Sequence, residues 1–107
     1  MKKYVVEVSK TAEQDLENII SYLRYDLAGD IIADKYKMLF KQKLSDLENL
    51  AGSMPVLDEN LTGHKNIRKL NVRNYIIFYV IDEEKTKAIV VRIGHAFMDW
   101  EKYLKDE

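Results

Sequence analysis

Runs of β-branched and aromatic residues in the C-terminal third of the chain predict three consecutive strands. The runs lie between Ile67 and His95 and are separated at Asn74 and at the polar segment 82–86. Short polar breaks between such runs are typical of β-hairpins, so they predict an antiparallel meander. In the middle run both alternating sets of side chains are apolar or aromatic. A strand of this kind is typically central and covered, at least in part, on both faces.

The last run predicts which side chains share a face of the sheet. Side chains alternate along a strand with a period of two, which places Ile89, Val91 and Ile93 together. Val90 and Arg92 fall on the other face. We therefore expect Arg92 to point away from the more apolar face.

Two stretches before the meander repeat apolar residues every three or four positions and predict helices. The first stripe spans 12–27, a short break follows at 28–30, and the second stripe spans 32–50. Gly52 and Pro55 then provide a strong stop signal. Because about three residues join the two helices, they must form an antiparallel hairpin, whose apolar stripes need the sheet for burial.

The remaining segments complete a β-α-α-β-β-β order. Residues 4–8 are β-branched and predict a first strand that joins the meander, and residues 52–66 predict a long loop. Apolar residues within 97–104 have helical spacing and predict a short terminal helix. The pattern predicts one α+β domain over residues 1–107, with the helical hairpin packed on an antiparallel sheet.

Composition excludes several kinds of site. The 107 residues include no cysteine, which excludes disulfides and zinc–thiolate sites, and the two histidines argue against a metal cluster. No phosphate-binding glycine loop is present, so no cofactor is expected. No leader pattern or apolar run of ~18 residues occurs, and we expect a cytoplasmic protein without a membrane role.

The charge of the chain is balanced in total but uneven in distribution. A net charge of −1 and a pI near 6.1 argue against nucleic-acid binding through overall charge. Residues 60–81 contain no acid, yet Lys65, Arg68, Lys69 and Arg73 fall there, while the predicted helices are acidic. This distribution predicts one basic side, although chance produces such a window equally well.

The order of elements resembles the RelE/ParE superfamily of toxins from type II toxin–antitoxin systems. The resemblance covers nearly the whole chain and rests on the segments 9–12 with 15–16, 67–70, 74–79, and 91–93 with 99–100. It implies one of two activities. RelE-like members cleave messenger RNA on the ribosome without a metal, and ParE-like members inhibit DNA gyrase. Both are neutralised by a cognate antitoxin, which we expect on the open face of the meander and in the groove beside the helices.

Two departures from the RelE-like pattern favour the ParE-like branch. An arginine follows the tyrosine of the middle strand in that pattern, whereas here Ile76 follows Tyr75. The RelE-like pattern also has basic residues just after the last strand. In residues 95–98 of this chain, only His95 has a titratable side chain. The ParE-like interpretation is therefore a toxin that binds an essential target such as gyrase.

The alternatives assign roles to a small set of residues. As a ribosome-dependent endonuclease the chain would use Arg73, Arg92 and His95 for proton transfer and phosphate stabilisation. A third alternative is a degenerate member that binds its antitoxin and harms nothing. Two of these residues also have competing structural roles. His95 can be hydrogen-bonded to the backbone at the strand end, and Arg92 can pair with an acidic group either in the terminal helix, such as Asp99, or on the antitoxin. The residues predicted to bind the target or RNA are Lys65, Arg68, Lys69, Tyr75 and Trp100, of which Trp100 can equally be a core residue.

Overall fold

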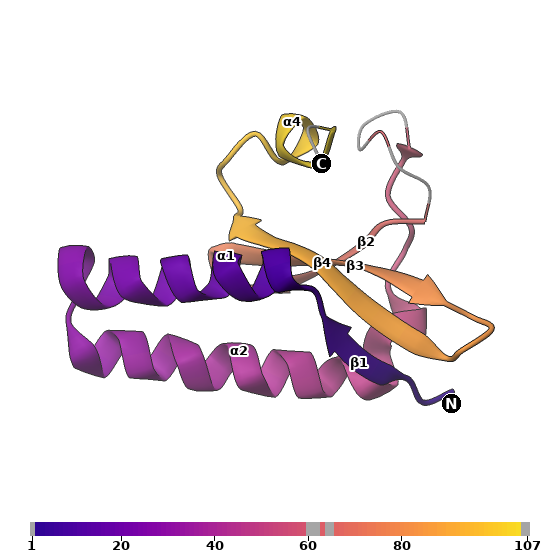
Figure 1. Ribbon diagram of the computed structural model, residues 1–107, viewed down its shortest axis with the longest axis horizontal. Coiled ribbons are helices and arrows are strands. Elements are labelled where there is room, and N and C mark those ends of the chain that lie inside the picture. Colours follow the sequence, from indigo (N-terminus) through magenta and orange to yellow (C-terminus); the bar gives the residue numbers. More distant parts are fainter. Residues whose placement is uncertain (1, 60–62, 64–65, 106–107) are drawn as a thin grey trace.

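A computed structural model, in which residues 2–59, 63 and 66–105 are described, contains four strands and two long helices (Figure 1). None of the described helices combines the length and apolar character needed to cross a membrane. The predicted α+β fold and order of elements are confirmed. The elements are β1 (Val5–Val8), α1 (Lys10–Ser21), η1 (Tyr22–Leu27), α2 (Asp30–Leu50), η2 (Ala51–Ser53), β2 (Arg68–Val72), β3 (Tyr75–Asp82), β4 (Lys87–His95) and α4 (Trp100–Lys105).

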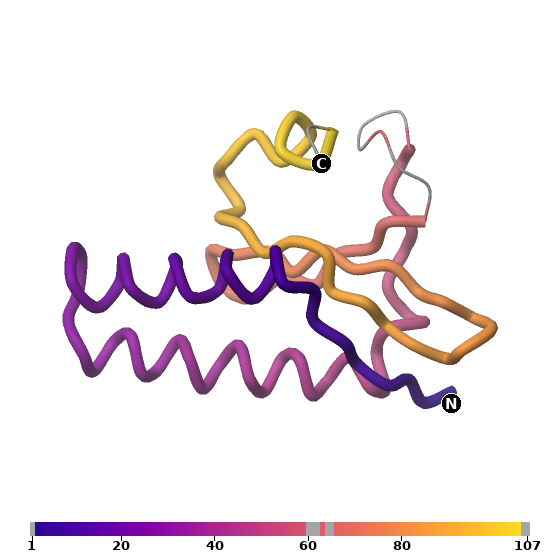
Figure 2. The backbone as a smooth tube through the Cα atoms, in the orientation of Figure 1, coloured from indigo at the N-terminus to yellow at the C-terminus, as the bar shows by residue number. Residues whose placement is uncertain are grey.

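The four strands form one sheet in the order β1-β4-β3-β2. β2, β3 and β4 pair antiparallel, which confirms the predicted meander. β1 joins the outer edge of β4 in parallel, with Val5 opposite Lys87 and Val8 opposite Val90. Antiparallel pairing is thus found only within the meander. The two long helices lie between β1 and β2 in the chain, so β1 is not joined to its neighbour β4 by a hairpin turn (Figure 2).

The two long helices form the predicted antiparallel hairpin and cover one face of the sheet. The Ser9 side chain caps α1 by accepting a hydrogen bond from the backbone N–H of Ala12 at 3.1 Å. Beyond Ser21 the helix continues as the π-helical segment η1 rather than as α-helix. The core between hairpin and sheet consists of Tyr4, Ala12, Phe40, Leu47, Ala51, Leu70, Val72, Tyr75, Ile77, Tyr79, Ala88, Val90 and Ile93.

The other face of the sheet is covered as well. α4 stands on the side opposite α2 (Figure 1). Leu104 of α4 packs with Ile76 and Phe78 of β3, and Trp100 and Leu57 lie against this cluster. The coverage predicted for β3 is confirmed on both faces. The expectation of an open meander face is consequently wrong where these apolar side chains lie.

A β-bulge interrupts the pairing of β3 with β4. Tyr79 pairs with Val90 and Phe78 with Arg92, so Val91 is an extra residue with no counterpart on β3. An extra residue reverses the alternation of side chains beyond it.

Because of the bulge, the side chains of β4 lie on other faces of the sheet than predicted. Ile93 lies with Val90 in the core beneath the hairpin, whereas Val91 packs with the cluster on the opposite face. The prediction that Ile89, Val91 and Ile93 share one face is wrong. Strict alternation holds only within an uninterrupted ladder, and no residue in this stretch marks the interruption.

Candidate functional site

An aromatic cluster marks the end of the sheet where the β2–β3 turn meets the last residue of β4. The ring of Tyr75 lies 5.7 Å from Tyr36, 5.6 Å from Phe40 and 5.2 Å from the imidazole of His95, centroid to centroid. Tyr75 is 7% exposed, and this burial raises the pKa of its hydroxyl. The tyrosine predicted as a stacking platform therefore has its ring packed between side chains of α2 and β4.

His95 ends β4 with its ring exposed. Its Nδ1 accepts a hydrogen bond from the backbone N–H of Phe97 at 3.2 Å, and the two rings lie 5.1 Å apart. The Ala96 N–H donates to the carbonyl of Asn74 at 2.7 Å, which fixes this turn against the β2–β3 turn. The backbone-bonded arrangement weighed for His95 is observed at Nδ1, so this nitrogen is occupied by a local amide.

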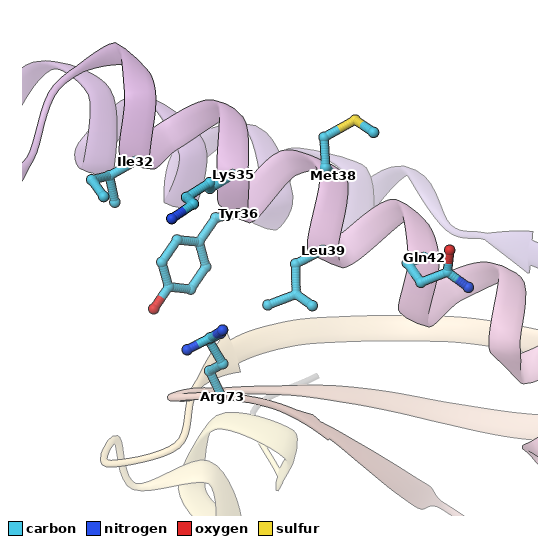
Figure 3. A pocket seen from close by; sticks show the side chains of 7 residues that line it. All are labelled: Ile32, Lys35, Tyr36, Met38, Leu39, Gln42 and Arg73. Atoms are coloured by element: carbon cyan, nitrogen blue, oxygen red, sulfur yellow. The ribbon is translucent and has the colours of Figure 1, made fainter.

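Arg73 lies beside this cluster, in the turn between β2 and β3. Its φ of 53° is in the left-handed region, and its side chain is exposed. Together with α2 it forms a surface groove with a volume of about 670 Å³ (Figure 3). Apolar walls with two cationic groups suit an extended segment that carries both apolar and acidic side chains. The lining residues are Ile32, Lys35, Tyr36, Met38, Leu39, Gln42 and Arg73.

Arg92 is held in a network that joins three elements. Its Nε lies 2.9 Å from Oδ2 of Asp15, and its Nη2 lies 3.0 Å from Oδ1 of the same carboxylate. Nη2 also donates to the hydroxyl of Tyr103, and the guanidinium carbon is 3.7 Å from the centroid of that ring. The side chains of Arg92 and Asp15 are only 15% and 12% exposed. Arg92 thus links β4 to α1 and α4.

The same carboxylate accepts further hydrogen bonds. Tyr103 donates its hydroxyl to Oδ1 of Asp15 at 2.9 Å, and the Ile93 N–H donates to Oδ2 at 3.0 Å. Burial, followed by the hydrogen bond and charge of Asp15, raises the pKa of Tyr103 to about 12. The acidic partner of Arg92 is therefore Asp15 on α1 rather than Asp99. Sequence reasoning missed Asp15 and Tyr103 because only the tertiary fold places them beside Arg92.

Arg68 lies at the opposite end of β2 from the Arg73 turn. Its Nη1 donates to the carbonyls of Met54 at 2.7 Å and of Gly52 at 3.2 Å. These carbonyls belong to the segment just after α2, so the observed contacts of Arg68 fasten that segment to the sheet.

The other residues predicted to bind a target are dispersed. Lys69 pairs with Phe78 of β3, and the Trp100 ring packs on the same phenylalanine at 5.9 Å. The core position weighed for Trp100 is thus the observed one. Lys65 lies outside the described residues. The structure therefore gathers Arg73, Tyr75 and His95 at one end of the sheet and places Arg68, Lys69 and Trp100 elsewhere.

Over residues 2–59, 63 and 66–105, no three histidine, aspartate or glutamate side chains converge as metal ligands.

A sequence comparison shows the family of the chain. Residues 6–100 match the sequence model described as "ParE toxin of type II toxin-antitoxin system, parDE". The chain belongs to the ParE toxin family. This result confirms the resemblance to the RelE/ParE superfamily. No curated protein sequence matches the chain.

Solved structures share the fold of this ParE-family chain at low sequence identity. A chromosomal ParDE system from P. aeruginosa matches with a TM-score of 0.71 at 15% identity, over 87% of this chain and 96% of that one. The RelBE2 toxin–antitoxin complex from Mycobacterium tuberculosis matches with a TM-score of 0.61 at 20% identity, over 87% and 98%. The E. coli RelBE complex matches with a TM-score of 0.53 at 18% identity, over 89% and 99%. At identities this low, the TM-scores show a common fold.

Proposed function

We propose that this ParE-family toxin arrests growth by binding an essential protein target, with DNA gyrase as the first candidate. A cognate antitoxin neutralises it by occupying the groove between α2 and the Arg73 turn. The toxin acts in the cytoplasm without a cofactor and does not cut RNA.

The observation that carries this proposal is the ion pair between Arg92 and Asp15. Metal-free RNA cleavage requires positive charge aimed at the crowded phosphate of the transition state. The guanidinium of Arg92 is instead held by both carboxylate oxygens of Asp15 and by Tyr103. A guanidinium neutralised in this way adds little positive potential for a phosphate. The RelE-like pattern that the resemblance implies also has an arginine after the tyrosine of the middle strand, where this chain has Ile76.

The antitoxin part of the proposal rests on the groove and on the relatives. Apolar walls beside Arg73 and Lys35 suit an amphipathic segment whose acidic groups face the two cations (Figure 3). The similar solved structures include a ParDE system and two RelBE toxin–antitoxin complexes. By analogy, we expect this chain to be a partner in a complex of the same kind.

The test is pulse labelling of cells after the toxin is induced alone. Thymidine and amino-acid incorporation are followed in parallel from the first minutes. An early fall in thymidine incorporation is expected, because gyrase inhibition stops replication before it stops translation. An early fall in amino-acid incorporation with thymidine unaffected would overturn the proposal. Unchanged incorporation of both would identify a non-toxic, antitoxin-binding member.

A purified assay supplies the direct control. The chain is added to the gyrase holoenzyme with relaxed plasmid, and supercoiling is followed with and without the full-length antitoxin. Inhibition that the antitoxin reverses is the expected result. Normal supercoiling at a large molar excess of the toxin would exclude gyrase as the target.

A second candidate, a RelE-like endonuclease, is favoured by one observation. Arg73, Tyr75 and His95 lie at the same end of the sheet, where an exposed imidazole and an exposed guanidinium flank an aromatic cluster. A histidine side chain is the commonest general acid or base in enzymes. This candidate predicts messenger RNA cleaved on the ribosome, and loss of that cleavage when His95 is replaced.

A further inference from the structure

The closed end of the helical hairpin carries a group of exposed apolar side chains that the fold does not use. These side chains, here called the tip patch, lie within η1 and the first turn of α2. Tyr25 and Ile31 are each 79% exposed, and Leu27 is 63% exposed. The hairpin extends beyond the sheet at this end (Figure 1), so the sheet cannot bury them. The tip patch consists of Tyr22, Tyr25, Leu27, Ile31 and Ile32.

The backbone beneath the tip patch has an unusual and well-fastened geometry. η1 is π-helical, a conformation that is rare in proteins and frequent at functional sites. The carbonyl of Leu23 accepts hydrogen bonds from the backbone N–H groups of Ala28 and Gly29, at 2.8 and 3.0 Å. Gly29 has a φ of 87°, which favours glycine in the turn before α2.

A side-chain clamp closes the same turn. Arg24 of η1 donates from Nη1 to Asp30 and from Nη2 to Asp34, both at 2.8 Å. One guanidinium therefore ties η1 to two turns of α2. The exposed side chains are presented on a preorganised support, which lowers the ordering cost when a partner binds.

Asp26 is the carboxylate of the tip patch region that Arg24 does not bind. Arg24 pairs with Asp30 and Asp34, and the cations Lys35 and Lys37 follow on α2. Exposed tyrosine and isoleucine side chains beside the exposed carboxylate of Asp26 suit an apolar protein surface with a lysine or arginine facing that carboxylate.

We infer that the tip patch is the surface through which the toxin engages its protein target. The target presents an apolar depression, into which Tyr25 and Ile31 insert, and a cation that faces Asp26. The inference rests on the proposed function, because it assigns the protein target of that function to the hairpin tip. The groove between α2 and the Arg73 turn, which is assigned to the antitoxin, shares only Ile32 with the tip patch. Contact with the antitoxin therefore does not require Tyr25 or Ile31.

The test compares three purified proteins for inhibition of gyrase supercoiling. They are the wild type, the double variant Tyr25→Ala with Ile31→Ala, and the control Val5→Thr. Val5 is 64% exposed on β1, and threonine preserves its shape while removing apolar surface. The double variant should need an at least ~10-fold higher concentration for half-inhibition, as for residues that anchor an interface. Both variants should melt like the wild type and bind the antitoxin as tightly.

Each outcome decides between the inference and the proposed function. If the double variant inhibits as well as the wild type does, the tip patch is not the target surface and the proposed function stands. If the double variant also loses antitoxin binding, the tip patch serves the antitoxin and the inference is overturned. If the wild type does not inhibit gyrase at all, the proposed target fails and this assignment fails with it.

A charge variant tests the cation of the target that faces Asp26. Asp26→Lys replaces an exposed carboxylate of η1 with a cation and leaves the apolar side chains in place. At low salt this variant should inhibit gyrase more weakly than the wild type does. The difference should shrink as salt is added, because salt screens a charge contact. Stronger inhibition by this variant would contradict the assigned partner.

Discussion

The Nε of Arg92 lies 2.9 Å from Oδ2 of Asp15, and this contact joins β4 to α1 across 77 positions of the chain. Tyr103 of α4 bonds to both side chains. The network therefore ties the edge of the sheet, the first helix and the terminal helix at one point. Its position explains how α4 is held over the sheet face opposite α2.

Replacing Asp15 with asparagine should destabilise the fold. The variant keeps the shape of the side chain but removes the carboxylate charge that pairs with the largely buried guanidinium of Arg92. The free energy of unfolding in urea should fall by about 2–4 kcal/mol.

The control for Asp15→Asn is the exposed pair of Lys87 and Glu7, 3.3 Å apart. Glu7→Gln should change the free energy of unfolding by less than ~0.5 kcal/mol, because exposed pairs are screened by solvent. Equal losses of unfolding free energy in the two variants would show that the Arg92–Asp15 pair stabilises the fold no more than an exposed pair does.

Replacing Leu104 with alanine should release α4 from the sheet. Leu104 is 1% exposed and packs with Phe78 and Ile76, so its truncation removes most of the apolar anchor of a six-residue helix. Trp100, the single tryptophan, lies 5.9 Å from the Phe78 ring and reports the docking of α4. The fluorescence emission of Trp100 should shift to longer wavelength, and its indole ring should become more accessible to quenchers.

The matched control for Leu104→Ala is Lys102→Ala, at an exposed position of the same helix. Its emission should match that of the wild type. An unchanged Trp100 spectrum in Leu104→Ala would mean that the network around Arg92 holds α4 without the apolar contact.

The order and type of the elements could be predicted because their signals are local. The stripes over 12–27 and 32–50 specify amphipathic helices wherever they pack, and the short break at 28–30 forces them into a hairpin. The meander is predictable for the same reason, since its polar breaks lie between adjacent strands.

Two features could not be predicted in the same way: the face of the sheet on which each β4 side chain lies, and the partner of Arg92. Each depends on pairing between distant segments. The bulge at Val91 is set by the register against β3, and Asp15 reaches Arg92 only because α1 lies along the end of β4 that β1 leaves unpaired. A basic window in the sequence likewise did not become one site, because Arg68 and Arg73 lie at opposite ends of β2.

The fold should lose stability above pH 10 in part through Tyr79. Burial raises the pKa of Tyr79 to about 12 from an ordinary value of 10.0, and its hydroxyl donates to the Ala51 carbonyl at 2.7 Å. The unfolded chain therefore releases this proton at a lower pH than the folded chain does. Stability is complete below pH 10 and falls as pH rises toward about 12, by at most ~1.4 kcal/mol per pH unit for one tyrosine.

Tyr79→Phe tests this assignment through the pH dependence of unfolding. The variant should be less stable near neutral pH by about 1 kcal/mol, because the carbonyl of Ala51 loses its side-chain donor. Its loss of stability above pH 10 should be shallower than that of the wild type, with Tyr103 supplying part of the remaining slope. Tyr25→Phe, at an exposed position, should leave both quantities unchanged. An identical alkaline slope in Tyr79→Phe and the wild type would disprove the role of this hydroxyl.

Replacing Arg73 and His95 together with glutamine separates a binding toxin from an RNA-cleaving one. Both side chains are exposed, so the double variant should melt within a few degrees of the wild type. If the toxin acts by binding gyrase through the hairpin tip, induction of the double variant should still stop thymidine incorporation early. The antitoxin should bind it several-fold more weakly, since Arg73 is one of two cations lining the groove. Loss of growth arrest in a variant that remains folded would instead assign the chemistry to this end of the sheet.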